Sequence, residues 1–202
     1  MTVFQLLMLG ASAYFAFKIY EHIQTLQEPD EKSSNSYERD DADEKSVNTF
    51  SPFSSEDLVE KADNAFEEED YTKALALLTE ANVKDANNPD IIFKIAYILQ
   101  KSGDNDEALK YYKEALELDK KNEYIHNSMA SIYRENREFT SAKMHIHASL
   151  DIDSQNPVTY YNYGNLLVDM QHNEEAIEMY KKALEINPDF EEAKQELETL
   201  EK

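Results

Sequence analysis

The feature that most constrains this chain is an internal repeat, in which residue types recur every 34 residues. Three columns of the repeat hold small residues: Ala62, Ala96, Ala130 and Gly164; Ala74, Ala108, Ala142 and Ala176; and Ala81, Ala115, Ser149 and Ala183. A fourth column holds large apolar residues: Leu78, Tyr112, Ile146 and Tyr180. A unit of this length cannot bury its apolar faces alone, so copies must stack on one another. The phase predicts four stacked units, at 55–88, 89–122, 123–156 and 157–190.

The last unit shows what each unit contains. Asn156 is suited to cap a helix, and Pro157 is suited to its first turn. Apolar residues at helical spacing then predict one helix over about 157–170 and a second over about 173–187, which ends before Pro188. Each unit is therefore expected to be a pair of amphipathic helices.

This pattern resembles the tetratricopeptide repeat (TPR) family, whose units carry bulky residues at positions 4, 7, 11 and 24 and small ones at 8, 20 and 27. Units 2 and 4 match nearly throughout, whereas unit 1 departs at Lys61 and unit 3 at His126. The resemblance spans 136 of the 202 residues. It implies an all-α fold, a right-handed α-solenoid of four TPR helix pairs. Residues 191–202 add Ala193, Leu197 and Leu200 among charged residues, which predicts a C-terminal capping helix.

The chain begins with an apolar stretch, since residues 1–17 carry no charged side chain and Ile19 and Tyr20 extend the stretch past Lys18. Twenty helical residues span about 30 Å, the thickness of a bilayer core. We therefore expect a single-pass transmembrane helix at 1–20. A cleaved signal peptide ending near Ala13 and a soluble helix docked on the repeats are the alternatives. Small residues in this stretch leave pairing between two copies open.

An acidic segment, 21–54, separates the apolar stretch from the repeats. It carries nine acidic and three basic residues and few aromatics, a composition that predicts a disordered linker. As a flexible coil it reaches on the order of 30 Å. Its basic residues follow the apolar stretch, whereas none precedes it, so the positive-inside rule places the repeats in the cytoplasm. The architecture resembles that of bacterial inner-membrane assembly factors, which favours that membrane.

Composition limits the chemistry that this chain can perform. A net charge of −22 argues against binding nucleic acid. Cysteine is absent, which excludes disulfides and thiolate chemistry. No phosphate-binding loop, nucleotide-binding glycine motif or nucleophile elbow occurs, and His145 and His147 lie two apart, on different sides of a helix. We therefore expect these two histidines to be solvated or half-packed, and we expect no catalytic residue, metal site or cofactor.

The TPR resemblance implies a concave groove lined by positions 2, 5, 6, 9, 12 and 13 of each unit. Carried over, the candidate partner-binding residues are Phe93, Lys94, Tyr97, Lys101, Asn127, Arg134, Tyr161, Asn162 and Asn165. Unit 1 is acidic at these positions, with Glu56, Glu60, Asp63 and Glu67. The basic residues in the middle favour a protein or peptide partner with an acidic element. The alternative is that these are ordinary solvated helix positions.

One familiar TPR activity is excluded by residue type. The carboxylate clamp of heat-shock co-chaperones requires Lys, Asn, Asn, Lys and Arg at five set positions, where this chain has Val59, Asp63, Lys94, Tyr124 and Ser128. The sequence thus predicts a membrane-anchored TPR scaffold or adaptor that holds a protein partner near the membrane. An exported TPR protein of envelope assembly and a non-catalytic accessory subunit of an enzyme complex are the alternatives.

Overall fold

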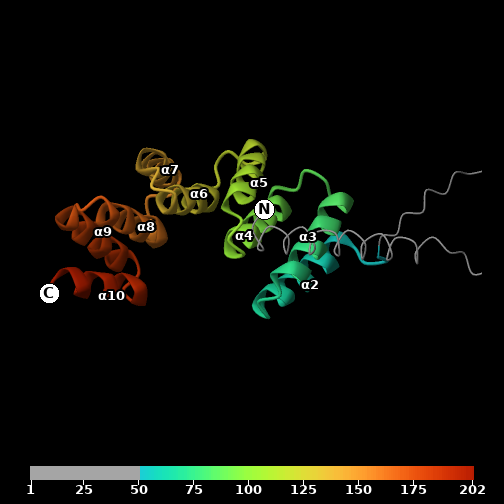
Figure 1. The fold of residues 1–202 in the computed structure, drawn as a ribbon, viewed down its shortest axis with the longest axis horizontal. Coiled ribbons are helices and arrows are strands. Elements are labelled where there is room, and N and C mark those ends of the chain that lie inside the picture. Colours follow the sequence, from blue (N-terminus) through green and yellow to red (C-terminus); the bar gives the residue numbers. More distant parts are fainter. Residues whose placement is uncertain (1–50) are drawn as a thin grey trace, which may run out of the picture. The chain divides into compact units, whose positions relative to one another are not determined.

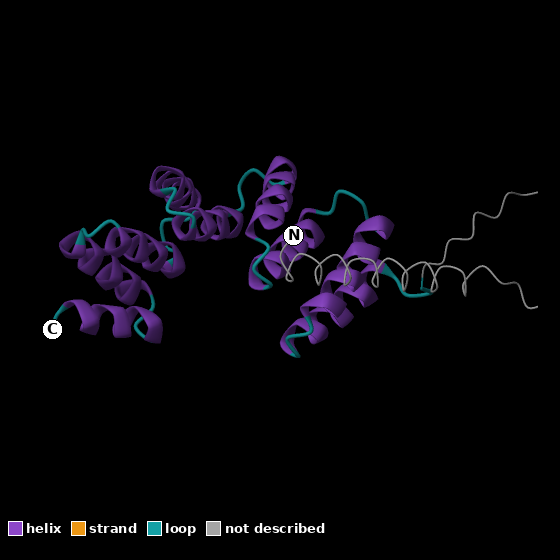
Figure 2. Ribbon diagram, in the orientation of Figure 1, coloured by secondary structure: helices purple, strands orange, loops and turns teal. Residues whose placement is uncertain are grey.

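The computed structural model describes residues 51–202, and this part of the chain is all-helical (Figures 1 and 2). Its helices are α2 (Ser55–Glu67), α3 (Tyr71–Lys84), α4 (Pro89–Lys101), α5 (Asn105–Leu118), α6 (Glu123–Glu135), α7 (Phe139–Ile152), α8 (Pro157–Asp169), α9 (Asn173–Ile186) and α10 (Glu191–Leu200). Consecutive helices pair, and successive pairs pack in sequence order. The predicted all-α solenoid of four helix pairs with a terminal capping helix is confirmed.

The predicted transmembrane helix at 1–20 and nearly all of the linker at 21–54 lie outside the described residues. Within 51–202, none of the helices combines the length and the apolar character that a membrane crossing requires.

The start of each helix pair is fixed by a capping side chain. Ser54 and Asp57 form a reciprocal capping box at α2. Asn88, Asn122 and Asn156 each accept a backbone N–H from the first turn of α4, α6 and α8. Because these caps recur every 34 residues, the four first helices begin at equivalent positions of the repeat.

The turn inside each pair has one conformation throughout. Glu69, Gly103, Arg137 and Gln171 occupy equivalent positions, and all have positive φ, between 60° and 90°. In each turn the next residue donates its backbone N–H to the carbonyl five residues earlier, at 2.8–2.9 Å, as in the Schellman motif that ends many helices. Only one of the four is glycine, so three turns hold a side chain in a backbone region that costs roughly 1–2 kcal/mol.

The small residues predicted from the repeat lie where the two helices of a pair touch. All twelve are buried. At Gly164 an added Cβ would come within 2.7 Å of Cδ1 of Tyr180. The Tyr180 hydroxyl donates to Asn165 Oδ1 at 2.8 Å, beside Gly164. The equivalent Tyr112 reaches Gln100 instead, also at 2.8 Å. The ring of Tyr180 thus occupies the space that a side chain at 164 would need.

The two ends of the repeat array are covered differently. At the C-terminal end, Leu197 and Leu200 of α10 pack against the apolar cluster that contains Leu167 and Tyr180. This covers a face of the fourth pair that would otherwise be exposed.

At the N-terminal end, residues 51–53 are held against the first pair. The backbone N–H and hydroxyl of Ser51 donate to Glu80 Oε1 at 2.8 and 2.6 Å. Lys84 Nζ donates to the carbonyls of Ser51 and Phe53, each at 2.6 Å. Lys61 Nζ lies 3.5 Å from the centroid of the Phe53 ring. Lys61, where unit 1 departs from the TPR pattern, therefore lies against this N-terminal segment.

We predict that Gly164→Ala destabilises the protein by about 1–3 kcal/mol, because Tyr180 must move from its packed position. The measurement is the free energy of unfolding of the full chain from urea titration. Tyr180→Leu introduces the residue type of Leu78, the equivalent residue of the first unit, where Ala62 stands at the position of Gly164. In that background Gly164→Ala should cost much less. An equal loss in both backgrounds would show that the Tyr180 ring does not set the requirement for glycine.

Candidate functional site

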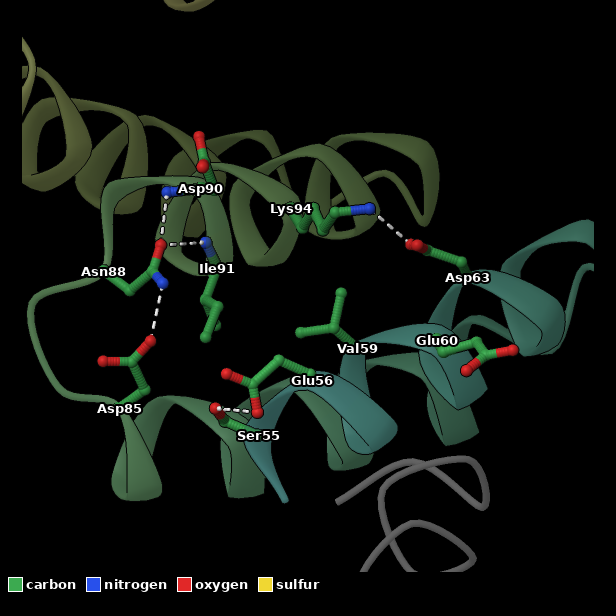
Figure 3. A pocket seen from close by; sticks show the side chains of 10 residues that line it. All are labelled: Ser55, Glu56, Val59, Glu60, Asp63, Asp85, Asn88, Asp90, Ile91 and Lys94. Atoms are coloured by element: carbon green, nitrogen blue, oxygen red, sulfur yellow. Dashed lines mark hydrogen bonds and ion pairs between the residues drawn. The ribbon is translucent and has the colours of Figure 1, made fainter. Parts of the chain in front are cut away.

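Two cavities lie between α2 and α4, the first helices of units 1 and 2. The first has a volume of about 400 Å³ (Figure 3), and it is lined by Ser55, Glu56, Val59, Glu60, Asp63, Asp85, Asn88, Asp90, Ile91 and Lys94. The second has a volume of about 380 Å³, and it is lined by Asp63, Phe66, Asp90, Phe93, Lys94, Tyr97 and Ile98. They share Asp63, Asp90 and Lys94, so they form one continuous groove, which we call the α2–α4 groove.

Helical spacing places the α2 side of this groove. Glu56 and Glu60 are four residues apart, as are Val59 and Asp63, and Glu56 and Val59 are three apart, so the four side chains lie on one face of α2. Val59 extends from α2 into the space between the helices, and Ile91 extends toward it from α4 (Figure 3). The groove therefore has apolar side chains between its acidic ones.

The turn between the pairs supplies the end wall of the first cavity. Asn88 caps α4 through its Oδ1 and donates its side-chain N–H to Asp85 Oδ2 at 2.6 Å. The same bond joins Asn122 to Asp119 one unit later, at 3.2 Å. Asp85 and Asn88 are thus structural residues of the turn that also border the cavity.

The charge in the first cavity is strongly unbalanced. Five carboxylates and one ammonium group line it. Lys94 Nζ pairs with Asp63 Oδ1 at 2.5 Å, so the only positive charge is already matched. Among the described residues, neither Glu60 nor Asp90 forms an ion pair. The first cavity therefore presents excess negative charge over apolar side chains.

The second cavity is aromatic. The ring of Tyr97 lies between those of Phe66 and Phe93, with centroid separations of 5.6 and 6.3 Å. Lys101 Nζ lies 5.2 Å from the Tyr97 centroid, a cation–π geometry. All three rings are only partly buried, so their remaining faces are open to a ligand.

The structure brings together three of the residues predicted from sequence. Phe93, Lys94 and Tyr97 line the α2–α4 groove, and Lys101 lies beside Tyr97. Arg134 lies further along the array and pairs with Asp169 of the next unit at 3.0 Å. Two of the three basic residues expected to attract an acidic partner are therefore neutralised by carboxylates of this chain.

The remaining predicted residues are used within the fold to different degrees. Asn127 is only 6% exposed, and its amide nitrogen donates to Thr159 Oγ1 at 2.7 Å across the boundary between units 3 and 4. It therefore differs from the expectation of a groove-facing amide. Asn165 accepts from Tyr180, and the ring of Tyr161 packs on Phe190 at 5.1 Å. Asn162 is half-buried and makes no side-chain hydrogen bond within the described residues.

Sequence reasoning left several lining residues out of the candidate site. Glu56, Glu60 and Asp63 were recognised as acidic groove positions but were not expected to form the cavity. Phe66 and Asp90 occupy positions 12 and 2 of their units, so the groove rule could have included them. Asp85, Ile91 and Ile98 fall outside that rule. Asp85 belongs to the turn between units 1 and 2, and the two isoleucines lie on the buried face of α4.

A second cluster of polar groups lies away from this groove, between α6 and α7. His126 and His145 face each other with their Nδ1 atoms 2.9 Å apart, and Tyr133 stacks on His145 with a centroid separation of 5.4 Å. Burial lowers the pKa of His126, and it lowers the pKa of His145 to about 4, with smaller contributions from His126 and Lys113. The expectation that His145 is solvated or half-packed is not met, since it is 7% exposed. Its neighbour on α7, His147, is exposed.

Comparison with known protein families covers most of the repeat region. Models described as Tetratricopeptide repeat match residues 65–132 and 158–190. The stretch between them, 133–157, contains α7 and the histidine that pairs with His126. No curated protein matches the sequence.

Solved structures give the same fold. MamA 41-end from Desulfovibrio magneticus RS-1 is 17% identical, with a TM-score of 0.62 over 72% of this chain and 82% of that one. PilF of Pseudomonas aeruginosa is 19% identical, with a TM-score of 0.66 over 72% of this chain and 67% of that one. YrrB, described as a TPR protein with an unusual peptide-binding site, is 21% identical, with a TM-score of 0.59 over 70% of this chain and 73% of that one. At these identities the likeness shows the fold alone.

We predict that the histidine pair makes the protein less stable in acid. The folded-state pKa of His145, about 4, lies below its ordinary value of 6.5, so the unfolded chain binds more protons between these values. The stabilisation is fully present above pH 6.5 and is lost as the pH falls toward 4. From pH 7 to pH 5 it should shrink by about 2 kcal/mol.

The measurement compares urea unfolding at both pH values for the full chain and for His126→Leu/His145→Leu, which carries the residue types of Leu58 and Leu77 at the equivalent positions of unit 1. As the pH falls, the free energy of unfolding of the variant should rise relative to that of the unmodified chain. The change in net charge with pH affects both proteins and therefore cancels in this comparison. His147→Gln is the control and should follow the unmodified chain. A pH-independent difference would contradict the prediction.

Proposed function

Because this chain carries tetratricopeptide repeats, we propose that it is a scaffold or adaptor that binds a protein partner on the face formed by the first helices of its units. The observation that carries this proposal is the continuous α2–α4 groove, whose two cavities fall within the size range of ligand sites, roughly 300–1,000 Å³. The peptide-binding site named for YrrB supports the same use of a TPR array.

An extended segment of the partner is the ligand that suits this groove best. The groove runs from the acidic first cavity to the aromatic wall of Phe66, Phe93 and Tyr97. Aromatic side chains supply contact area at low cost in conformational entropy. Separate but adjoining cavities accept separate side chains of one segment. Beyond the groove, Asn162 and Lys101 extend the proposed surface along the array.

The sequence predicts that the partner carries an acidic element, and this stays a prediction. It has less support at Lys94 and Arg134, because carboxylates of this chain already pair with them. A partner carboxylate would have to displace Asp63 from Lys94 or Asp169 from Arg134. Partly exposed ion pairs are worth about 0–1 kcal/mol, so such displacement costs little but also gains little. Lys101, which is exposed over Tyr97, is the best place for such an element.

We further propose the domain organisation predicted from sequence: a membrane anchor at 1–20, a tethering linker at 21–54, four TPR units at 55–190 and a capping helix at 191–202. Such a protein would hold its partner near the membrane. The bias of basic residues supports a cytoplasmic repeat domain, with the bacterial inner membrane favoured. Export to the cell envelope, a place as accessory subunit of an enzyme complex, and self-association are the alternatives that the experiments below address.

We predict that a photo-crosslinking amino acid introduced at Tyr97 of the full chain captures one defined protein in cells, because this residue lines the groove. The same group at Val83, an exposed position on α3 outside the groove, is the matched control. Mass spectrometry identifies the adduct and shows whether it is an enzyme, an envelope component or a second copy. Identical adducts at both positions, or none at Tyr97, would contradict binding in the groove.

We predict that a single cysteine at Ser33 is protected from a membrane-impermeant maleimide in intact cells and becomes labelled after lysis, with the protein in the membrane fraction. The absence of native cysteine makes this readout specific. Labelling in intact cells would reverse the proposed orientation and favour the exported alternative. A protein that remains soluble after lysis would contradict the anchor.

A further inference from the structure

We propose that the first cavity of the α2–α4 groove recognises a basic side chain, lysine or arginine, of the partner and that the aromatic second cavity receives an apolar neighbour of that residue. This inference rests on the proposed function and names the chemistry of its ligand. It reverses the sign of charge expected from sequence, because the expectation counted Lys94 as available and the structure pairs it.

The charge of the cavity selects a cation. Five carboxylates meet one ammonium group there, and that group is held by Asp63. The chain as a whole carries −22, so its long-range field also favours the approach of a basic partner. An acidic segment would meet Glu56 and Glu60, whose carboxylates have no counter-charge within residues 51–202.

The apolar lining selects a long side chain over a small ion. Val59 and Ile91 lie between the carboxylates of the first cavity. Lysine and arginine bury their aliphatic stems along apolar surface while the charged head stays at the polar rim. Within 51–202, no three acidic or histidine side chains converge closely enough to hold a metal ion. Carboxylates around apolar side chains match an amphipathic cation.

The adjoining aromatic cavity defines the neighbour. Phe66, Phe93 and Tyr97 form a wall whose partly exposed rings suit an aliphatic or aromatic side chain. Because the cavities share Asp63, Asp90 and Lys94, one short extended segment can reach both. The predicted recognition element is thus a basic residue close to an apolar one, which is a pattern that a defined peptide set can test.

The experiment measures binding of a positional-scanning library of fluorescein-labelled peptides, about nine residues long, to the purified full chain in mild detergent, by fluorescence anisotropy. Arginine and lysine pools beside a phenylalanine or leucine should bind most tightly, and glutamate pools least. The best peptide is then titrated against Glu56→Lys/Glu60→Lys, which should weaken it about tenfold or more. Its affinity for the unmodified chain should fall as salt is raised.

The control is Glu174→Lys/Glu178→Lys on α9, which repeats the same charge change at the same two helix positions outside the groove. It should leave affinity within about twofold of the unmodified chain. Phe93→Ala/Tyr97→Ala tests the second cavity and should weaken any groove-bound peptide.

The outcomes separate this inference from the proposed function. Selection of acidic or uncharged peptides that lose affinity with Phe93→Ala/Tyr97→Ala would overturn the inference and leave groove binding intact. Basic peptides that bind equally to both charge-reversed variants would also overturn it. Absence of binding by every pool, or binding that no groove variant weakens, would overturn the proposed function together with the inference.

Discussion

Close contact between the two helices of each pair is the interaction on which the rest of this structure depends. Alanine, serine or glycine occupies every position of the three small columns, and all are buried. Small residues bring the backbones together, so the large side chains opposite them, such as Leu78 and Tyr112, can fill the space beside the contact. Without that approach, the first helices would not be held at the spacing that forms the α2–α4 groove.

The fold could be predicted from sequence because the same pattern of small and large residues recurs at 34-residue intervals over four copies, which only a stack of equivalent helix pairs satisfies. Helix-capping residues and prolines mark where the helices begin and end. The candidate site could be predicted only in part. Phe93, Lys94 and Tyr97 follow from their positions in the repeat. The pairings Lys94–Asp63 and Arg134–Asp169 join residues 31 and 35 apart, so they depend on how neighbouring units sit together and which rotamers their long side chains adopt. Neither is encoded in the periodic pattern.

Where a polar residue replaces an apolar one of the repeat pattern, a second polar residue lies close enough to bond to it. His126 and His145 replace apolar residue types in the same unit and bond to each other. Asn127 is buried where units 2 and 4 carry aromatic rings, and its amide reaches Thr159, which also bonds to Ser149 at 3.0 Å. A buried polar group is costly without a partner and acceptable with one. Asn127 is satisfied only in part, because its buried Oδ1 makes no hydrogen bond within the described residues. Inspecting one position at a time therefore finds each departure but misses the residue that bonds to it.

The attachment of residues 51–53 to α3 has a mechanical consequence. Tension applied to the chain before Ser51 reaches Glu80 and Lys84 of α3 before it reaches the capping box of α2. The bonds from Ser51 and Phe53 to these two residues share the load, and the Phe53 ring passes part of it to Lys61 of α2. The first helix pair is thus pulled as a body at two helices, not peeled from its first turn.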